Sequence, residues 1–283
     1  MAVIAITSFS GAPGCTTLAV AWAYLNPRPV LLLEADPTGG SPVLAGPFRA
    51  ELYHDDSVLN LVDYEGESLM QALWHHAYPL PDTTDRRALP TVAAHHQARS
   101  MGAMWPAISR AARAMSEQTG TDIVIDLGRR GMEYSPAGLL TGADLVICLT
   151  DATLPALNAA RWGLDSLRED LAGSGDPDRA VLVTTRPHPG PVRGLFPGRR
   201  DAAPAVRPWS ASEIRAITDP TPVLAELAFD RASAQVFSHG ALGPREPKDN
   251  PYAKSVQALI GDAESHLAAL TAEQHHDDLE VDA

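Results

Sequence analysis

The sequence contains little lysine, little cysteine and no long apolar run. Only Lys248 and Lys254 occur among 283 residues, and all other basic residues are arginines. Two cysteines, Cys15 and Cys148, lie far apart and form no redox or metal-ligand motif, which favours a reducing compartment, the cytoplasm. No run of about 18 uncharged apolar residues occurs, so the sequence predicts no membrane-spanning helix.

Positive charge is scarce relative to negative charge. The chain has 22 Lys and Arg against 35 Asp and Glu, a net charge of -13. Such a field repels a phosphate backbone and argues against non-specific DNA binding.

The helix expected over residues 253–270 has an apolar stripe, but Asp262 and Glu264 on its polar face argue against docking on an anionic membrane. Histidine pairs are adjacent and lack the i, i+4 spacing of a helical zinc site.

Short Val/Ile/Leu runs alternate with longer helical patterns, which predicts a doubly wound, mostly parallel α/β sheet flanked by helices. The start of the chain is apolar but lacks a basic leader, so it is interpreted as a buried strand and not as a signal peptide. We expect one domain over residues 1–270, a surface loop at 187–208 and a disordered acidic tail at 271–283. Strands are expected at 3–7, 30–34, 89–93, 122–126, 145–150, 180–185 and 223–228, and helices at 16–25, 68–76, 101–118, 154–171, 210–217, 231–238 and 253–270.

A Gly-rich turn connects the first expected strand to the first expected helix. Residues 8–17 read Ser-Phe-Ser-Gly-Ala-Pro-Gly-Cys-Thr-Thr. A turn of this kind directs backbone N–H groups and the positive end of a helix at one point, which is suited to phosphate. The ordinary P-loop pattern has Gly at the position of Phe9 and Lys at the position of Cys15, so the loop departs from it twice.

Four further segments extend the pattern in order along the chain. Residues 30–41 read Val-Leu-Leu-Leu-Glu-Ala-Asp-Pro-Thr-Gly-Gly-Ser, and they resemble the Asp-x-Asp-Pro-x-Gly segment of the ParA/MinD-like ATPases. Residues 10–17 align without a gap to the Lys-Gly-Gly-x-Gly-Lys-Thr-Thr loop of that family. Residues 122–128 resemble its Walker B strand, 143–147 its next strand, and 227–230 its segment beside the nucleotide base. The resemblance spans residues 2–270 and implies the P-loop NTPase fold.

The resemblance implies a nucleotide site for ATP or ADP with Mg²⁺. Thr16 matches the magnesium-binding hydroxyl, and Asp126 matches the carboxylate that holds magnesium through water. Asp36 matches the carboxylate that positions the attacking water, and Glu34 replaces the Asp before it. The alternative for Glu34 and Asp36 is a solvated turn after a buried strand. The phosphate-binding segment implied by the resemblance comprises Gly11, Ala12, Gly14, Cys15, Thr16 and Thr17.

Both lysines of the family's loop are missing, because Ser10 and Cys15 occupy their positions. A charge-assisted hydrogen bond to phosphate is worth roughly 1.5–3 kcal/mol, so its loss weakens binding about ten- to a hundredfold. Pro13 also removes a backbone N–H. Hydrolysis depends on electrostatic stabilisation and is expected to suffer more, leaving a weak or absent ATPase. Arg129 and Arg130 either supply the missing charge or are ordinary loop arginines.

Two other consequences follow from these replacements. In the family the first lysine reaches across a dimer, so a homodimer is possible but its nucleotide dependence is left open. A thiol at a helix N-terminus, such as Cys15, is expected to have a lowered pKa. The alternative is that Cys15 is a small residue filling the place of the lysine.

The resemblance implies a positioning protein. The first hypothesis is a pseudo-ATPase scaffold that recruits a protein assembly, such as a partition complex or a pilus or secretion system of the kind placed by TadZ/CpaE-like members. The second is a slow, dimerising Mg-ATP switch, and the third is a nucleotide-free structural subunit. Thr185 falls near a position where relatives carry an Asn that reads adenine, so base preference stays open.

Overall fold

The computed structural model describes the chain except for residues 12, 186–208, 229, 282 and 283. The described residues form an eight-stranded sheet with the order β3-β4-β2-β5-β1-β6-β7-β8. Neighbouring strands are parallel except for the antiparallel β3–β4 pair. The strands are β1 (Val3–Ser8), β2 (Val30–Glu34), β3 (Tyr78–Pro79), β4 (Arg86–Leu89), β5 (Asp122–Arg129), β6 (Leu145–Asp151), β7 (Ala180–Thr185) and β8 (Val223–Leu227).

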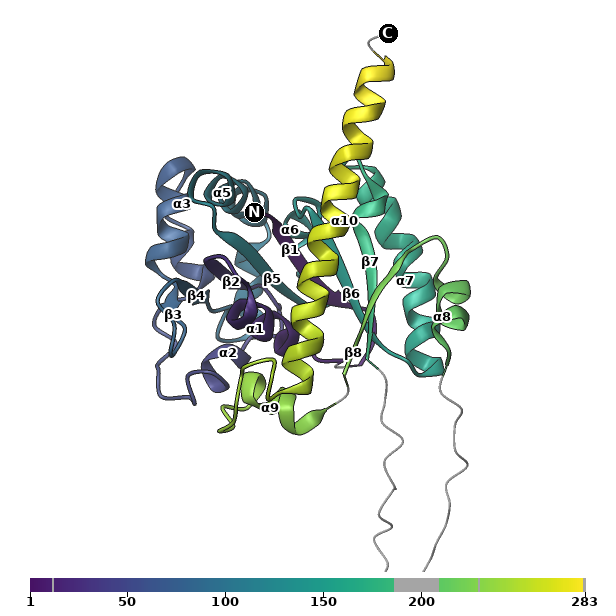
Figure 1. The fold of residues 1–283 in the computed structure, drawn as a ribbon. Coiled ribbons are helices and arrows are strands. Elements are labelled where there is room, and N and C mark those ends of the chain that lie inside the picture. Colours follow the sequence, from purple (N-terminus) through teal and green to yellow (C-terminus); the bar gives the residue numbers. More distant parts are fainter. Residues whose placement is uncertain (12, 186–208, 229, 282–283) are drawn as a thin grey trace, which may run out of the picture.

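Helices cover both faces of this sheet (Figure 1). One face carries α1 (Cys15–Leu25), α9 (Arg231–Ser238) and α10 (Pro251–Val281), and the other carries α3 (Gly66–His75), α5 (Trp105–Thr119), α6 (Ala137–Thr141) and α7 (Leu154–Ala172), with α8 (Ala211–Thr218) against α7. The predicted doubly wound α/β fold is confirmed. Shorter elements are α2 (Pro42–Ala45), α4 (Ala98–Met101) and three 3-10 turns, η1 (Val58–Leu61), η2 (His95–Gln97) and η3 (Pro177–Arg179).

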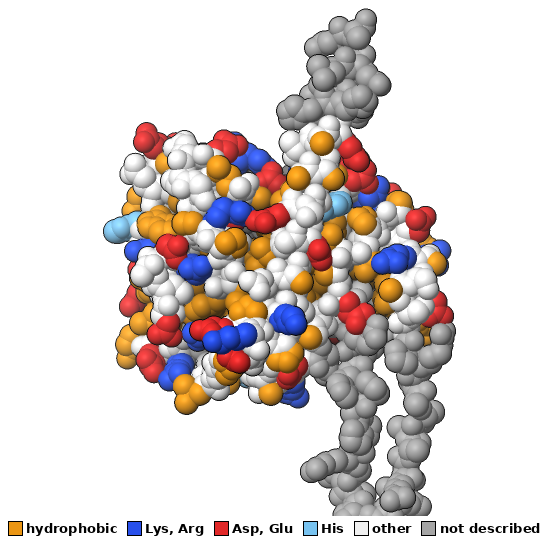
Figure 2. Space-filling model, viewed as in Figure 1, with side chains coloured by type: hydrophobic (Ala, Val, Ile, Leu, Met, Phe, Trp, Pro, Cys, Tyr) orange, Lys and Arg blue, Asp and Glu red, His pale blue; other side chains and the backbone are white. Residues whose placement is uncertain are grey.

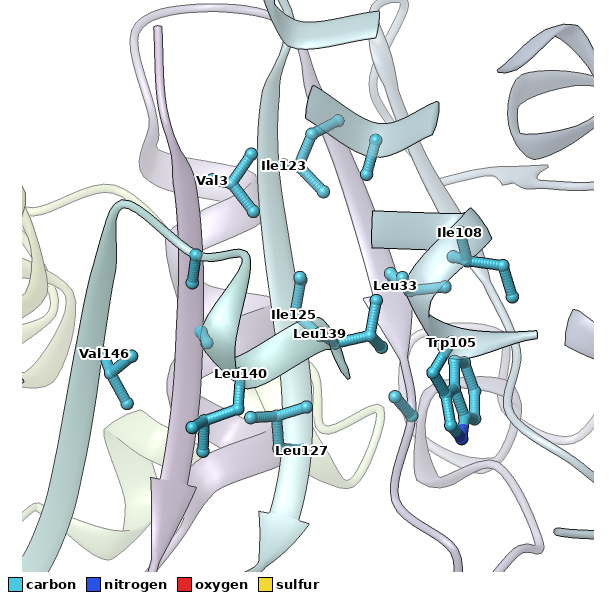
Figure 3. Close-up of a cluster of buried hydrophobic side chains, with 14 of the residues drawn as sticks. Val3, Leu33, Trp105, Ile108, Ile123, Ile125, Leu127, Leu139, Leu140 and Val146 are labelled. Carbon is cyan, nitrogen blue, oxygen red and sulfur yellow. The ribbon is translucent and has the colours of Figure 1, made fainter. Parts of the chain in front are cut away.

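The core consists of two apolar layers, one on each face of the sheet, because successive side chains of a strand point to opposite sides. In β1, Ile4 and Ile6 face α1 and α10, whereas Val3 packs toward α5 and α6. Figure 3 shows the second layer, in which Val3, Ile123 and Ile125 of the strands lie beneath Ile108 of α5 and Leu139 of α6. This double coverage explains why the central strands are almost continuously apolar.

The third predicted strand lies too far along the sequence. The sequence predicts 89–93, but β4 spans Arg86–Leu89 and pairs with β2. Pro90 follows Leu89 and has no N–H to donate to the ladder, which ends the strand. The arginines at the start of the strand are accommodated by backbone carbonyls. Arg86 Nη2 donates to Asn26 O at 2.6 Å, and Arg87 Nη1 donates to Ala77 O at 2.7 Å.

Two helix predictions also differ from the structure. The helix expected at 101–118 is divided into α4 and α5, because Gly102 follows α4 and α5 begins only at Trp105, with Pro106 in its first turn. The segment 271–283 was expected to be a disordered tail, yet α10 continues through Val281. This segment contains neither Pro nor Gly, so nothing in its sequence ends a helix. The surface loop expected at 187–208 lies outside the described residues.

Surface charge is mixed on the side of the molecule that carries α10. Figure 2 shows acidic and basic side chains interspersed on this face, with apolar atoms between them. Within the described part of the chain, no helix is long and apolar enough to span a bilayer.

Asp122, at the amino end of β5, holds neighbouring segments together through hydrogen bonds, so its loss is expected to reduce stability. Its buried carboxylate accepts hydrogen bonds from Ala2 N at 2.8 Å, Asn26 Nδ2 at 2.8 Å and Arg28 Nε at 2.7 Å. Asp122→Ala should lower the free energy of unfolding by about 1–3 kcal/mol, because Ala2 N and Asn26 Nδ2 lose their buried acceptor, whereas the partly exposed Arg28 keeps Glu264 as a partner. Urea denaturation measures this change. The control is Asp178→Ala, since the carboxylate of Asp178 is 60% exposed and its loss should cost no more than about 1 kcal/mol; equal losses in the two variants would contradict the assignment.

Candidate functional site

The Gly-rich turn lies where β1 ends and α1 begins. Gly14 is the N-cap of α1 with φ of 102°, a left-handed conformation that favours glycine, and no side chain caps the helix. The first N–H groups of α1 therefore have no side-chain acceptor at the N-cap, as a phosphate cradle requires. Gly11 also has positive φ, 65°, and a Cβ there would meet nothing within 4 Å. Ala12, which was expected in the cradle, lies outside the described residues.

Thr16 and Asp126, the residues predicted to hold magnesium, are in direct contact. Thr16 Oγ1 donates to Asp126 Oδ2 at 2.5 Å, and Gly128 N donates to Asp126 Oδ1 at 3.0 Å. Asp126 is 1% exposed at the centre of the sheet. Burial raises the pKa of its carboxyl to about 6, although both hydrogen bonds act in the opposite direction.

Glu34, at the end of the neighbouring strand β2, is completely buried. It accepts hydrogen bonds from Ser41 Oγ, from Val43 N at 3.0 Å and from Thr91 N at 3.4 Å. Burial raises the pKa of Glu34 to about 8, and the negative charge of Asp126 adds to the rise. Glu34 thus does not lie in a solvated turn; it holds the start of α2 and the segment after β4 against the sheet.

Asp36 lies two residues after the end of β2 and is half-buried. Its Oδ1 accepts hydrogen bonds from Thr38 N at 2.8 Å and Thr38 Oγ1 at 2.7 Å. A Cβ on Gly128 would lie 2.0 Å from Asp36 Oδ2, so the carboxylate of Asp36 packs directly against the end of β5. The structure therefore brings together the three acidic residues that the sequence analysis selected.

Cys15 does not have the predicted reactivity. Its side chain is buried in the layer beneath α1. Burial raises the pKa of the thiol, and the nearby Asp126 charge raises it further. The expectation of a lowered pKa is wrong, because desolvation outweighs the effect of the helix N-terminus. The geometry agrees with the alternative of a small apolar residue in the place of the lysine.

Phe9 anchors the beginning of the loop to α7. Its ring packs against Gly163, where a Cβ would lie 2.1 Å from Phe9 Cδ1. This contact is not among those predicted from the sequence. Two signals were present: a large aromatic residue where the pattern has Gly, and a glycine inside a helix, where glycine is unfavourable by roughly 1 kcal/mol. A glycine in that position indicates close packing.

The two arginines after Asp126 have different environments. The guanidinium of Arg130 forms an ion pair with Asp170 of α7, and Arg130 N donates to Ser8 O at 2.8 Å. The charge of Arg130 is thus engaged by α7, whereas Arg129 is exposed.

The residues expected near the nucleotide base are only partly described. At the end of β7, Thr185 Oγ1 donates to Asp151 Oδ1 at 2.5 Å. Phe229, in the segment expected beside the base, lies outside the described residues.

Among the described residues no group of three or more His, Cys, Asp or Glu side chains is arranged to hold a metal ion. A magnesium ion at Thr16 and Asp126 would therefore take its other ligands from phosphate oxygens and water, as Mg²⁺ commonly does. The hydroxyl, the carboxylate and the uncapped helix start fit a Mg-nucleotide. The lysine that would share the phosphate charge is absent.

The raised pKa of Glu34 predicts a pH-dependent stability. The folded-state pKa of Glu34 is about 8, against an ordinary value of 4.5. The stabilisation that comes from protonated Glu34 is therefore fully present below pH 4.5 and is lost as the pH rises through 8. Urea denaturation should show the free energy of unfolding falling by roughly 2–4 kcal/mol between pH 5 and pH 8. Glu34→Gln, which resembles the protonated acid, should remove the part of this fall above about pH 6, while the part due to the raised pKa of Asp126 remains. Glu117→Gln on the exposed side of α5 should leave it unchanged; an unchanged fall in Glu34→Gln would refute the assignment.

Comparison with known proteins gives matches in structure but not in sequence. No protein-family profile matches the chain, and no curated protein sequence matches it. Among solved structures, a ParA family ATPase from Chlorobium tepidum TLS has 12% identity and a TM-score of 0.63, covering 91% of this chain and 96% of that one.

Two MinD structures are similar to the same extent. The septum site-determining protein MinD of Pyrococcus horikoshii OT3, complexed with Mg-ADP, has 18% identity and a TM-score of 0.61, covering 93% of this chain and 95% of that one. The MinC:MinD cell division complex of Aquifex aeolicus contains a chain with 15% identity and a TM-score of 0.62, with coverages of 92% and 96%. The chain has the fold of the ParA/MinD-type P-loop ATPases.

Proposed function

We propose that this chain is a ParA/MinD-like positioning protein that recruits a partner assembly, and that its phosphate loop binds Mg-nucleotide weakly and hydrolyses it slowly or not at all. The observation that carries this proposal is that the described residues of the loop keep the glycine conformations and the uncapped helix start of a phosphate site, while the cation is missing. Gly14 and the start of α1 keep the geometry for phosphate, Thr16 meets Asp126, and the position of the lysine holds a buried, neutral Cys15.

The residues have separable tasks in this proposal. Backbone N–H groups of the loop and of the first turn of α1 bind the phosphates. Thr16 and Asp126 hold Mg²⁺, which when bound neutralises phosphate oxygens and offsets part of the missing lysine charge. Asp36, against Gly128, is the candidate to orient a water molecule. Because the cradle holds no lysine, transition-state charge is poorly stabilised and turnover is slow.

Structures with a similar fold support a protein partner. One structural neighbour is a MinC:MinD complex and another is a ParA family ATPase. We propose that this chain likewise acts through a protein partner, either a partition complex or a pilus or secretion system. A surplus of 13 negative charges disfavours DNA or an anionic membrane as the primary surface.

A slow ATPase switch is the second candidate. Asp36, Thr16 and Asp126 all lie at one edge of the sheet, although the lysines are missing. In a switch, nucleotide would drive self-association of two copies, and Asp36→Ala would retain the nucleotide-bound dimer. In the scaffold, the oligomeric state would not change with nucleotide. Analytical ultracentrifugation with ATP and magnesium separates the two.

Nucleotide binding is tested by restoring the missing charge. The wild-type chain should bind ATP in a magnesium-dependent manner, and Cys15→Lys should tighten binding about ten- to a hundredfold, because it restores a charge-assisted hydrogen bond worth roughly 1.5–3 kcal/mol. Thr16→Ala should weaken binding. Calorimetric titration of ATP and ADP, with and without magnesium, measures all of these affinities.

The matched control is Thr141→Ala at the end of α6, whose hydroxyl bonds only within its own helix, to Ala137 O. It should bind ATP as the wild type does. If neither Cys15→Lys nor Thr16→Ala changes the affinity, the loop does not cradle phosphate, and the chain is the nucleotide-free subunit.

Positioning is tested in the cell that encodes the chain. A fluorescent fusion should form discrete foci or polar accumulations, and Asp36→Ala should keep them, because recruitment in the scaffold does not need hydrolysis. Fluorescence microscopy of wild type and variant provides the measurement. A uniform distribution of the wild-type fusion would contradict a positioning role, and loss of foci in Asp36→Ala alone would favour the switch.

A further inference from the structure

A cavity lies behind the phosphate loop, on the face of the sheet opposite α1. Its volume is about 360 Å³, and it is bounded by Thr7 of β1, by Leu127 of β5, by the connection from β5 to α6, and by α7. It is separate from the cradle, because α1 covers the other face of the sheet. None of the roles proposed above uses this space.

The lining of the cavity combines a pair of charged residues with apolar and hydroxyl-bearing ones. Leu127 and Leu140 are among the apolar lining residues, and Ser135 and Ser166 are the serines. The charged residues are Arg130 and Asp170, which form an ion pair. Ser135 Oγ donates to Met132 O at 2.7 Å, which fixes one wall of the connection. A site of this composition suits a small ligand with an apolar body and one polar group.

The two partners of the ion pair are held unequally. The side chain of Arg130 is 20% exposed, whereas that of Asp170 is 53% exposed. The more exposed carboxylate can move into water at little cost, because ion pairs with exposed members contribute roughly 1 kcal/mol or less. A guanidinium has five N–H donors and matches carboxylate or phosphate oxygens in a bidentate manner. An incoming anion can therefore take the place of Asp170 without moving Arg130.

We propose that this cavity is a binding site for a small organic oxyanion, a carboxylate or a phosphate monoester with an apolar body, which pairs with Arg130 in place of Asp170. The apolar body of the ligand lies against Leu127 and Leu140. Ser166, in the lining of the cavity, supplies a hydrogen bond to its oxygens.

The walls of this site are attached to the beginning of the phosphate loop. Arg130 N donates to Ser8 O at 2.8 Å, and Thr7 Oγ1 donates to Gly128 O at 3.0 Å. On the other wall, the ring of Phe9 packs on Gly163, one turn before Ser166 in α7. A ligand in the cavity thus contacts both elements that hold residues 7–9. The site goes beyond the proposed function and does not depend on nucleotide binding.

The test is titration with defined probes in the absence of nucleotide, followed by calorimetry or saturation-transfer NMR. The probes are phenyl phosphate and benzoate, and benzamide is the neutral control. Both anions should bind with a Kd on the order of 1 mM, and benzamide should bind at least about tenfold more weakly. Binding of phenyl phosphate alone assigns the site to phosphate monoesters; equal binding of benzamide overturns the proposal.

Variants separate this site from the phosphate loop. Arg130→Gln should weaken probe binding at least about tenfold through loss of the charge-assisted pair, and Arg161→Gln on the exposed side of α7 should leave it unchanged. Asp170→Asn keeps the arginine and should tighten binding about threefold or more, which remains informative if Arg130→Gln folds poorly. If Thr16→Ala abolishes probe binding while Arg130→Gln retains it, the anion occupies the cradle and the proposal fails.

Discussion

The burial of two neighbouring carboxyl groups, Glu34 of β2 and Asp126 of β5, constrains the part of the molecule around the Gly-rich turn. Glu34 and Asp126 are each 1% exposed, and a buried carboxylate is costly unless it is hydrogen-bonded or neutralised. Hydrogen bonds satisfy these groups. Ser41, Thr91 and Thr16 supply them. The start of α1, the start of α2 and the segment after β4 are thereby attached to the same two strands.

The same constraint determines how this part of the molecule responds to an anion. Three carboxyl groups converge there, and the guanidinium of Arg130 is paired with Asp170 of α7. Phosphate alone meets an unfavourable potential, because like charges repel strongly in a poorly hydrated setting. A divalent cation reverses the sign of that potential. Any nucleotide affinity of this loop is therefore tied to the metal more closely than in a loop that contains lysine.

Much of this arrangement is accessible from the sequence, because it depends on local patterns. Continuous apolar runs indicated β1, β2, β5, β6 and β7, and the glycines indicated the turn between β1 and α1. The contact between Thr16 and Asp126 could be predicted from the resemblance. The two-residue edge strand β3 could not, since it is defined by its pairing with β4, and the predicted bounds of β4 were shifted because its first residues are arginines that carry no apolar signal.

The properties that sequence could not provide all depend on tertiary burial. A carboxyl after a strand can be solvated or enclosed, and only the position of α2 over Glu34 decides which applies. The thiol of Cys15 has a helix N-terminus beside it and an apolar layer around it, and the strength of desolvation decides the direction of its pKa. The packing of Phe9 on Gly163 joins residues that lie far apart in sequence.

That last contact restricts the routes by which the loop can change. With Phe9 in place, position 163 tolerates only glycine, and with glycine at 163, removal of the ring leaves an unfilled space beside α7. A larger residue at 163 becomes acceptable only after the ring has gone, so the two positions are epistatic. Gain or loss of the pair by single substitutions therefore passes through the state with glycine at 163 and no ring at position 9, and that state leaves the space beside α7 unfilled.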